Sequence, residues 1–212
     1  VLHRKSGYIE YYNRHNSNLP SNNIYSIISD GYGGLWVASL EYLLHFDIDK
    51  RNFTIVDVDE DGHKLQQYNR LLFCDSKKRI WAGGEMGISV FNQVGTSLLP
   101  NTDFQIASVL KQAFVNCFYE TSSGYLWIGT RNGLFALKES DKQFLQYTTE
   151  NGLPSNVIYG ILEDAYGRLW ISTNQGLSCL NPESGKFRNF TIMDGLQGNQ
   201  FNAGAYCRKE IG

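Results

Sequence analysis

Short apolar runs separated by Gly- and Asn-containing turns follow one another along this chain. They are clearest near its end, where tight turns at Asn174-Gln175-Gly176 and Pro182-Glu183-Ser184-Gly185 separate alternating segments. Short runs bounded by such turns are typical of β-hairpins. The pattern predicts four antiparallel strands in this unit: Val157–Glu163, Leu169–Thr173, Leu177–Leu180 and Phe187–Thr191.

The third run of each unit is apolar at nearly every position. These runs are Leu43–Phe46, Ile88–Phe91, Leu134–Leu137 and Leu177–Leu180. Strands that are apolar on both faces belong to sheets covered on both sides. The pattern therefore predicts sheets that stack against neighbouring sheets.

The unit recurs four times, each time centred on a Trp. Trp36, Trp81, Trp127 and Trp170 are separated by 45, 46 and 43 residues. An Asp or Thr stands six residues before each Trp, at the first position of a turn that ends in Gly or Lys. Asp and Thr side chains at the first position of a turn accept hydrogen bonds from the amides of that turn. Four strands repeating at about 45 residues indicate a β-propeller blade. A β-solenoid would have shorter coils, and a sandwich would not repeat its hairpins in register.

We therefore predict an all-β propeller with four-stranded antiparallel blades. Full blades are expected over residues 18-60, 61-108, 109-151 and 152-194. Residues 1-17 resemble the end of a preceding blade, because Ser6–Tyr12 matches Ser184–Phe190. Residues 195-212 resemble the start of a further blade, because Gly195-Leu196 matches Gly152-Leu153. We expect a partial ring, completed by the remaining blades of a longer parent chain; the N-terminus, which begins with Val1 and has no secretion-signal pattern, agrees with this.

Composition and charge argue against some classes of binding partner. The formal net charge is −2 and no basic stripe is visible, so nucleic acid is not an expected partner. No apolar run is long enough to span a bilayer, so we expect no membrane contact at this segment. The four cysteines lack metal-binding or disulfide-framework spacing, and we expect them to be small buried hydrophobic residues.

One face of a propeller carries both the turns between second and third strands and the loops entering each blade. The turns vary in sequence while the strands repeat, which is typical of a binding face. Solvated turns without function are the alternative for any single residue. The candidate ligand-binding residues are Glu41, Glu85, Arg131, Asn132, Asn174 and Gln175. The Trp residues are expected to pack between blades, whereas Tyr25, Tyr68 and Tyr159 are better placed to line the channel.

Metal, cofactor and catalytic signals are weak. Asp57, Asp59 and Asp61 followed by Gly62 begin like a calcium loop, but the EF-hand pattern then requires a Glu where Tyr68 stands. The four histidines are dispersed, and no nucleophile elbow, phosphate-binding loop or kinase motif is found. We predict no metal site, no cofactor and no enzymatic activity for this segment.

The residues from Asn151 to Leu177 resemble the two-component regulator propeller repeat almost throughout. Asn18 to Leu43 is also similar, although it loses the late Thr and Gly of the pattern. The resemblance implies the periplasmic sensor region of a hybrid two-component system, in which propellers are followed by a membrane helix and a histidine kinase. It also implies an oligosaccharide ligand, a dimeric parent anchored in the inner membrane, and a role in polysaccharide utilisation in Gram-negative bacteria.

We therefore expect a binding and signalling module. Two alternatives remain at this point. One is a propeller enzyme acting on glycans, a lyase or a glycosidase, whose carboxylate pair could come from distant loops. The other is a structural propeller that supports dimerisation while the ligand binds elsewhere.

Overall fold

The computed structural model of this chain describes residues 2–3, 7–39, 42–56, 69–101, 110, 113–138 and 143–207. These residues form four antiparallel sheets of four strands each, in simple chain order. The first sheet comprises β3 (Ile24–Ser29), β4 (Leu35–Ser39), β5 (Leu43–Asp47) and β6 (Asn52–Ile55). The second sheet comprises β7 (Asn69–Cys74), β8 (Arg79–Gly84), β9 (Gly87–Val94) and β10 (Ser97–Pro100). The third sheet comprises β11 (Val115–Glu120), β12 (Tyr125–Thr130), β13 (Gly133–Lys138) and β14 (Gln143–Tyr147). The fourth sheet comprises β15 (Ile158–Glu163), β16 (Leu169–Thr173), β17 (Gly176–Asn181) and β18 (Lys186–Phe190).

Three short elements accompany these sheets. A two-stranded antiparallel pair, β1 (Leu2–His3) with β2 (Tyr8–Ile9), precedes the first sheet. Two short 3-10 helices, Thr149–Asn151 and Ile192–Asp194, follow the last strands of the third and fourth sheets. Each begins at a Thr capping box and ends at a left-handed Gly, so the two blade-to-blade loops share one local design.

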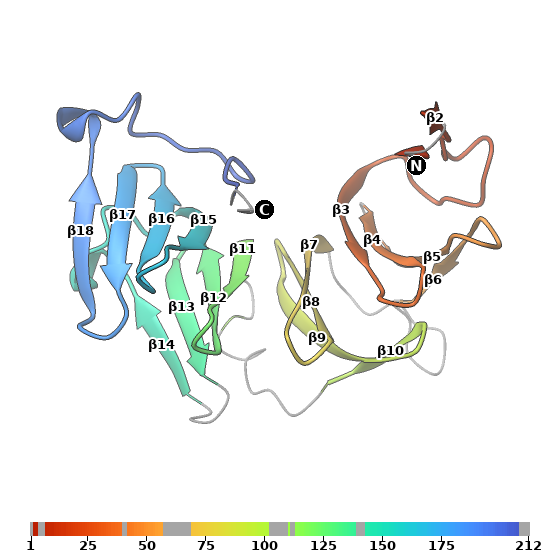
Figure 1. The fold of residues 1–212 in the computed structure, drawn as a ribbon, viewed down its shortest axis with the longest axis horizontal. Helices are drawn as coiled ribbons and strands as arrows, with labels where there is room; N and C mark the ends of the chain where they lie inside the picture. Colours follow the sequence, from red (N-terminus) through yellow and green to blue (C-terminus); the bar gives the residue numbers. More distant parts are fainter. Residues whose placement is uncertain are drawn as a thin grey trace.

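The four sheets lie in an open arc around a common centre (Figure 1). The first strands face that centre, with β3 beside β7, β7 beside β11, and β11 beside β15. This is the arrangement of propeller blades, so the predicted all-β fold and the partial ring are confirmed. The predicted strands agree with the observed ones to within a residue or two, except that β9 runs three residues beyond the predicted end, to Val94.

The turn before each Trp forms as the sequence predicts. Gly33, Gly124 and Gly167 have positive φ angles of 97°, 81° and 74°. Lys78 occupies the same place in the second blade with φ 64°, a conformation that residues with a Cβ rarely adopt. The turn itself therefore requires a positive φ angle at this position, whether the residue is Gly or Lys.

The core lies between blades. Trp36, Trp81 and Trp127 are almost completely buried, and each belongs to a cluster built largely from the next sheet. The predicted inter-blade role of these three is confirmed. Trp170 is only half-buried and stacks on Phe190 of its own blade, with ring centroids 5.5 Å apart.

Acidic residues of the turns serve as acceptors for two of the indoles. Trp81 Nε1 donates to Asp75 Oδ2 at 2.8 Å, and Trp170 Nε1 donates to Asp164 Oδ2 at 3.0 Å. Arg79 and Arg168 bond the same carboxylates through Nε, at 2.6 Å and 2.8 Å. An Asp–Arg–Trp cluster thus ties the turn to the strand that follows it in the second and fourth blades.

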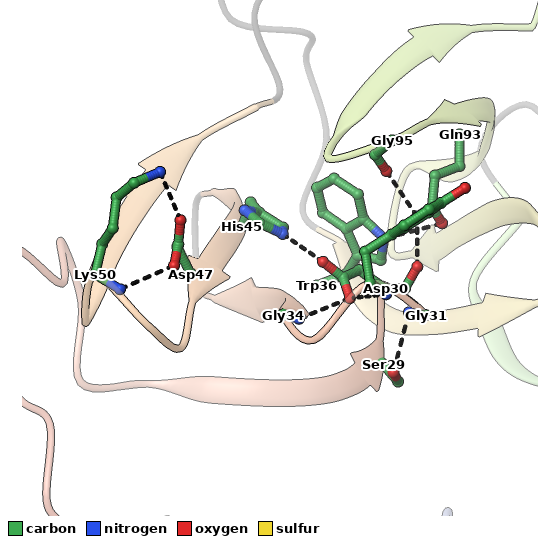
Figure 2. A network of polar contacts seen from close by, with 11 residues as sticks. Ser29, Asp30, Gly31, Gly34, Trp36, His45, Asp47, Lys50, Gln93 and Gly95 are labelled. Carbon is green, nitrogen blue, oxygen red and sulfur yellow. Dashed lines mark hydrogen bonds and ion pairs between the residues drawn. The ribbon is translucent and has the colours of Figure 1, made fainter.

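In the first blade the indole of Trp36 has a different acceptor, which lies in the neighbouring blade (Figure 2). Trp36 Nε1 donates across the blade boundary to Gln93 Oε1 at 3.2 Å. Asp30 instead accepts a hydrogen bond of 2.8 Å from His45 Nε2, while Gln93 Nε2 donates to the Asp30 carbonyl oxygen. Burial alone would raise the pKa of Asp30, but the bonds from His45 and two backbone amides outweigh it and lower that pKa.

Some sequence predictions need correction, and others lie outside the described residues. Cys117 and Cys179 are buried as expected, but Cys74 is half-buried, and Cys207 is exposed and outside any strand. Cys207 lies in the irregular segment after the fourth sheet, so the strand expected around it does not form. Among the described residues no helix is long and apolar enough to cross a membrane. Glu41, Tyr68 and the Asp57, Asp59 and Asp61 segment lie outside the described residues.

Candidate ligand-binding face

The turn between second and third strands and the loop entering the blade lie at the same edge of each sheet. In the third blade, Thr130 ends β12 and pairs with Val115 at the start of β11 and with Gly133 at the start of β13. The turn also bonds the loop that enters the next blade, because Gly133 N donates to Asn156 O at 2.8 Å. This edge, called the upper edge below, therefore joins neighbouring blades as well as strands.

Each first strand carries a β-bulge near the upper edge. The pairing register skips one residue in β3, β7, β11 and β15, between Ile24 and Ser26 in the first case and at the matching place in the others. The skipped residues are Tyr25, Arg70, Asn116 and Tyr159, each eleven residues before the Trp of its unit. Bulges re-aim side chains and are frequent beside functional sites. We call these four residues the bulge set.

The first two members of the bulge set meet across a blade boundary. The Arg70 guanidinium carbon lies 5.1 Å from the centroid of the Tyr25 ring, and Arg70 Nη2 donates to Glu85 Oε1 at 2.5 Å. The Tyr25 side chain is 43% exposed, so part of its ring is open to solvent. The predicted residue Glu85 is therefore part of an exposed aromatic, cationic and anionic cluster.

Arg131 packs against Phe114 at the upper edge of the third blade. Its guanidinium carbon lies 3.8 Å from the centroid of the Phe114 ring, and its backbone amide donates to Phe114 O at 3.0 Å. The structure pairs Arg131 with no carboxylate among the described residues, and its side chain is exposed. Asn132, beside it, is exposed, and its carbonyl oxygen accepts a bond from Gln146 Nε2.

The fourth blade presents amides at the same edge. Asn174 Oδ1 is buried and has no hydrogen-bond partner among the described residues. Gln175 is exposed, and its backbone amide donates to Thr173 Oγ1 at 3.0 Å. Of these two side chains, the exposed Gln175 is therefore the one that a ligand at the upper edge can reach, whereas Asn174 Oδ1 is closed to solvent.

The five described candidates are thus distributed over three blades, and no hydrogen bond or ion pair joins two of them. The sequence reasoning included Tyr25 and Tyr159 but missed Arg70, Asn116 and Phe114. The signal for Arg70 and Asn116 was their place eleven residues before the Trp, which becomes meaningful only once the bulge is known. No group of three metal-ligating side chains occurs within the described part of the chain.

Comparison with known proteins agrees with this architecture. A model of the two component regulator propeller matches residues 18–41, 110–132 and 152–175. The extracellular domain of a hybrid two-component system from B. thetaiotaomicron is 25% identical, with a TM-score of 0.70, over 86% of this chain and 24% of its own length. A search among curated proteins finds no match.

Two further structures share the fold alone. The extracellular domain of another B. thetaiotaomicron hybrid two-component system is 19% identical, with a TM-score of 0.63, over 82% of this chain and 25% of its own. A catalytically inactive virginiamycin B lyase from Staphylococcus aureus is 13% identical, with a TM-score of 0.57, over 81% of this chain and 57% of its own. This chain spans about a quarter of the length of the two sensor domains.

The repeated turn and the inter-blade Trp residues thus accompany the matching segments in three of the four blades. Those segments match the two-component regulator propeller repeat, and the chain is similar in fold to the extracellular domain of a hybrid two-component system.

Proposed function

We propose that this chain is part of the extracytoplasmic sensor region of a hybrid two-component system and binds an oligosaccharide at its upper edge. The observation that carries the proposal is the bulge set, which places Tyr25, Arg70, Asn116 and Tyr159 at one position of four successive blades. The similarity to the extracellular domain of a hybrid two-component system supports the sensor role. In this proposal the segment is periplasmic and its parent is a dimeric, membrane-anchored histidine kinase that regulates polysaccharide utilisation.

The chemistry of the upper edge suits a hydroxylated, extended ligand. An exposed aromatic ring such as that of Tyr25 offers a flat apolar surface against which a sugar ring stacks. Arg70 and Arg131 supply planar donors, and the exposed Gln175 supplies a side-chain amide. Because these groups come from all four blades, a ligand of several sugar units would contact more of them than a small metabolite could.

Signalling would follow from differential binding. A ligand shifts a conformational equilibrium only by the difference between its affinities for the two states. Tyr25 and Arg70 belong to adjacent blades, so a ligand that spans them is sensitive to the relative position of those blades. An oligosaccharide bound there would stabilise one arrangement of the ring and of the dimer.

The test is calorimetric titration of the full extracytoplasmic region with a panel of oligosaccharides. Tyr25→Ala and Arg70→Ala are each expected to weaken binding at least about tenfold, the loss of roughly 1.4 kcal/mol. Tyr32→Ala is the control, because Tyr32 is an exposed Tyr in the turn at the opposite edge of the same blade.

Three results would contradict the proposal. Unchanged affinity in both variants would remove the upper edge as the site. Loss of dimerisation without loss of affinity would favour the structural role. Glycan turnover would favour an enzyme, a candidate raised by the lyase that shares this fold.

A further inference from the structure

The turn between second and third strands carries opposite charges in two neighbouring blades. Glu85 and Arg131 each stand four residues after the Trp of their unit, so they occupy the same place at the upper edge. In the second blade Arg70 Nη2 donates to Glu85 Oε1 at 2.5 Å, so these two charges balance each other. Arg131 makes no ion pair with a described residue. Its positive charge is therefore uncompensated within the described part of the chain.

The Arg131 guanidinium is exposed and lies against an aromatic ring. Its central carbon is 3.8 Å from the centroid of the Phe114 ring, a van der Waals contact. The backbone of the turn is also fixed, because Arg131 N donates to Phe114 O at 3.0 Å and Asn132 N donates to Thr130 Oγ1 at 2.9 Å. Contact with an aromatic face restricts a guanidinium without using its N–H donors.

The donors of this side chain are unused among the described residues. A guanidinium has five N–H groups, and the Arg131 side chain donates none of them to a described acceptor. Glu150, the acidic residue of the loop that enters the fourth blade, is exposed and forms no ion pair with Arg131. Four other described arginines each pair with a carboxylate: Arg51, Arg70, Arg79 and Arg168. Arg131 is the described arginine that stands at a turn between second and third strands, and it has no such partner.

A ligand that covers the upper edge would remove water from this charge. Withdrawing a charged group from water is unfavourable unless an opposite charge replaces the water. A neutral hydroxyl group can accept one N–H bond but leaves the charge uncompensated. A carboxylate or a sulfate can accept two parallel bonds from a guanidinium and also neutralises it. The uncompensated Arg131 therefore favours a ligand with an anionic group at the third blade.

We propose that the ligand of the upper edge is an acidic oligosaccharide, in which the carboxylate or sulfate of one sugar unit pairs with Arg131. The inference rests on the function proposed above and adds the charge of the ligand. A neutral sugar unit would lie at Tyr25, where Arg70 and Glu85 balance each other, and the acidic unit would lie two blades further on. The edge would thus fix the direction of the bound chain as well as its chemistry.

The experiment is isothermal titration calorimetry on the full extracytoplasmic region with pairs of oligosaccharides that differ only in charge. The pairs are tetragalacturonate and its methyl ester, a glucuronate-bearing xylotetraose and xylotetraose, and a κ-carrageenan tetrasaccharide and its desulfated form. At least one acidic member is expected to bind at least about tenfold more tightly than its neutral partner. That preference should weaken as NaCl is added, because salt screens exposed charges. The first two pairs report a carboxylate and the third reports a sulfate.

Three variants assign the preference to one side chain. Arg131→Gln should lower the affinity for the acidic member at least about tenfold and leave the affinity for the neutral member unchanged. Arg131→Lys keeps the charge but not the paired N–H groups, so it should retain part of the preference. Arg188→Gln is the matched control, because Arg188 is also exposed, lies 4.8 Å from the Phe190 ring centroid, and belongs to the middle of the outer strand β18. It should leave both affinities unchanged, and the urea midpoint of each variant shows whether it is folded.

The remaining outcomes separate this inference from the function on which it rests. Binding of neutral members alone, equal affinity within every pair, or a preference that survives in Arg131→Gln would overturn the acidic ligand and leave the oligosaccharide sensor standing. Sodium acetate and sodium sulfate are titrated alone, and binding as tight as that of the acidic oligosaccharide would show a simple anion site instead. If no oligosaccharide binds at all, the proposed function and this inference both fail.

Discussion

Replacement of Asp75 by Ala tests the role of the turn before Trp81 most directly. The Asp75 side chain is 1% exposed, and its carboxylate accepts from Trp81 Nε1 at 2.8 Å, Arg79 Nε at 2.6 Å, and the backbone amides of Arg79 and Lys77 at 2.9 Å and 3.0 Å. Removing one partner of a buried ion pair costs about 3–5 kcal/mol. Hydrogen bonds to a charged group are worth about 1.5–3 kcal/mol each, but bonds within one cluster are not additive. We expect Asp75→Ala to lower the free energy of unfolding by about 4 kcal/mol.

Urea unfolding followed by circular dichroism would measure this loss. Asp75→Asn keeps an acceptor oxygen for the amides but loses the charge opposite Arg79, so it should fall near half the effect, about 2 kcal/mol. Thr121→Ala is the control at the same turn position, where only a neutral cap is lost, at a cost of about 1 kcal/mol. An Asp75→Ala variant as stable as Thr121→Ala would show that the cluster does not support the blade, and the reasoning would fail.

Three further predictions concern pH, packing and thiol chemistry. Burial alone would raise the pKa of Asp164, but bonds from the Trp170 indole and from the amides and guanidinium of the turn lower it to about 2, from an ordinary 3.8. The stability this carboxylate provides is therefore complete above about pH 4 and is lost as the pH falls towards 2, so urea midpoints should drop over that window less steeply in Asp164→Asn. Gly129→Ala should lower the unfolding free energy by about 1–3 kcal/mol, because the added Cβ would collide with the Cys117 sulfur, whereas Gly198→Ala, with open space around it, should have no effect on the same measurement. Burial raises the pKa of the Cys117 thiol to about 12, so mass spectrometry after iodoacetamide treatment of the folded protein should find Cys207 modified and Cys117 unmodified.

Much of the fold could be predicted from local patterns, because similar turn and strand residues recur in all four units. The turn before each Trp requires a capping side chain and a residue with positive φ, and both requirements act within a few residues. The burial of Trp36, Trp81 and Trp127 was predictable for the same reason. The candidate site was harder to predict from the sequence. The variable turns indicated Arg131 and Asn174 but not Arg70, whose position at the site depends on a bulge.

The sequence by itself thus determined the blade, its period and its turns, since these depend on residues close together in the chain. The tertiary structure alone decided which side chains meet across blade boundaries. Arg70 reaches Tyr25 and Glu163 reaches Ser122 only because neighbouring blades stack, although each pair is separated by more than forty residues in the chain. Trp127 lacks an acceptor among the described residues because Thr121 replaces the Asp of the second and fourth blades and because, unlike Gln93 beside Trp36, no side chain of the next blade takes its place.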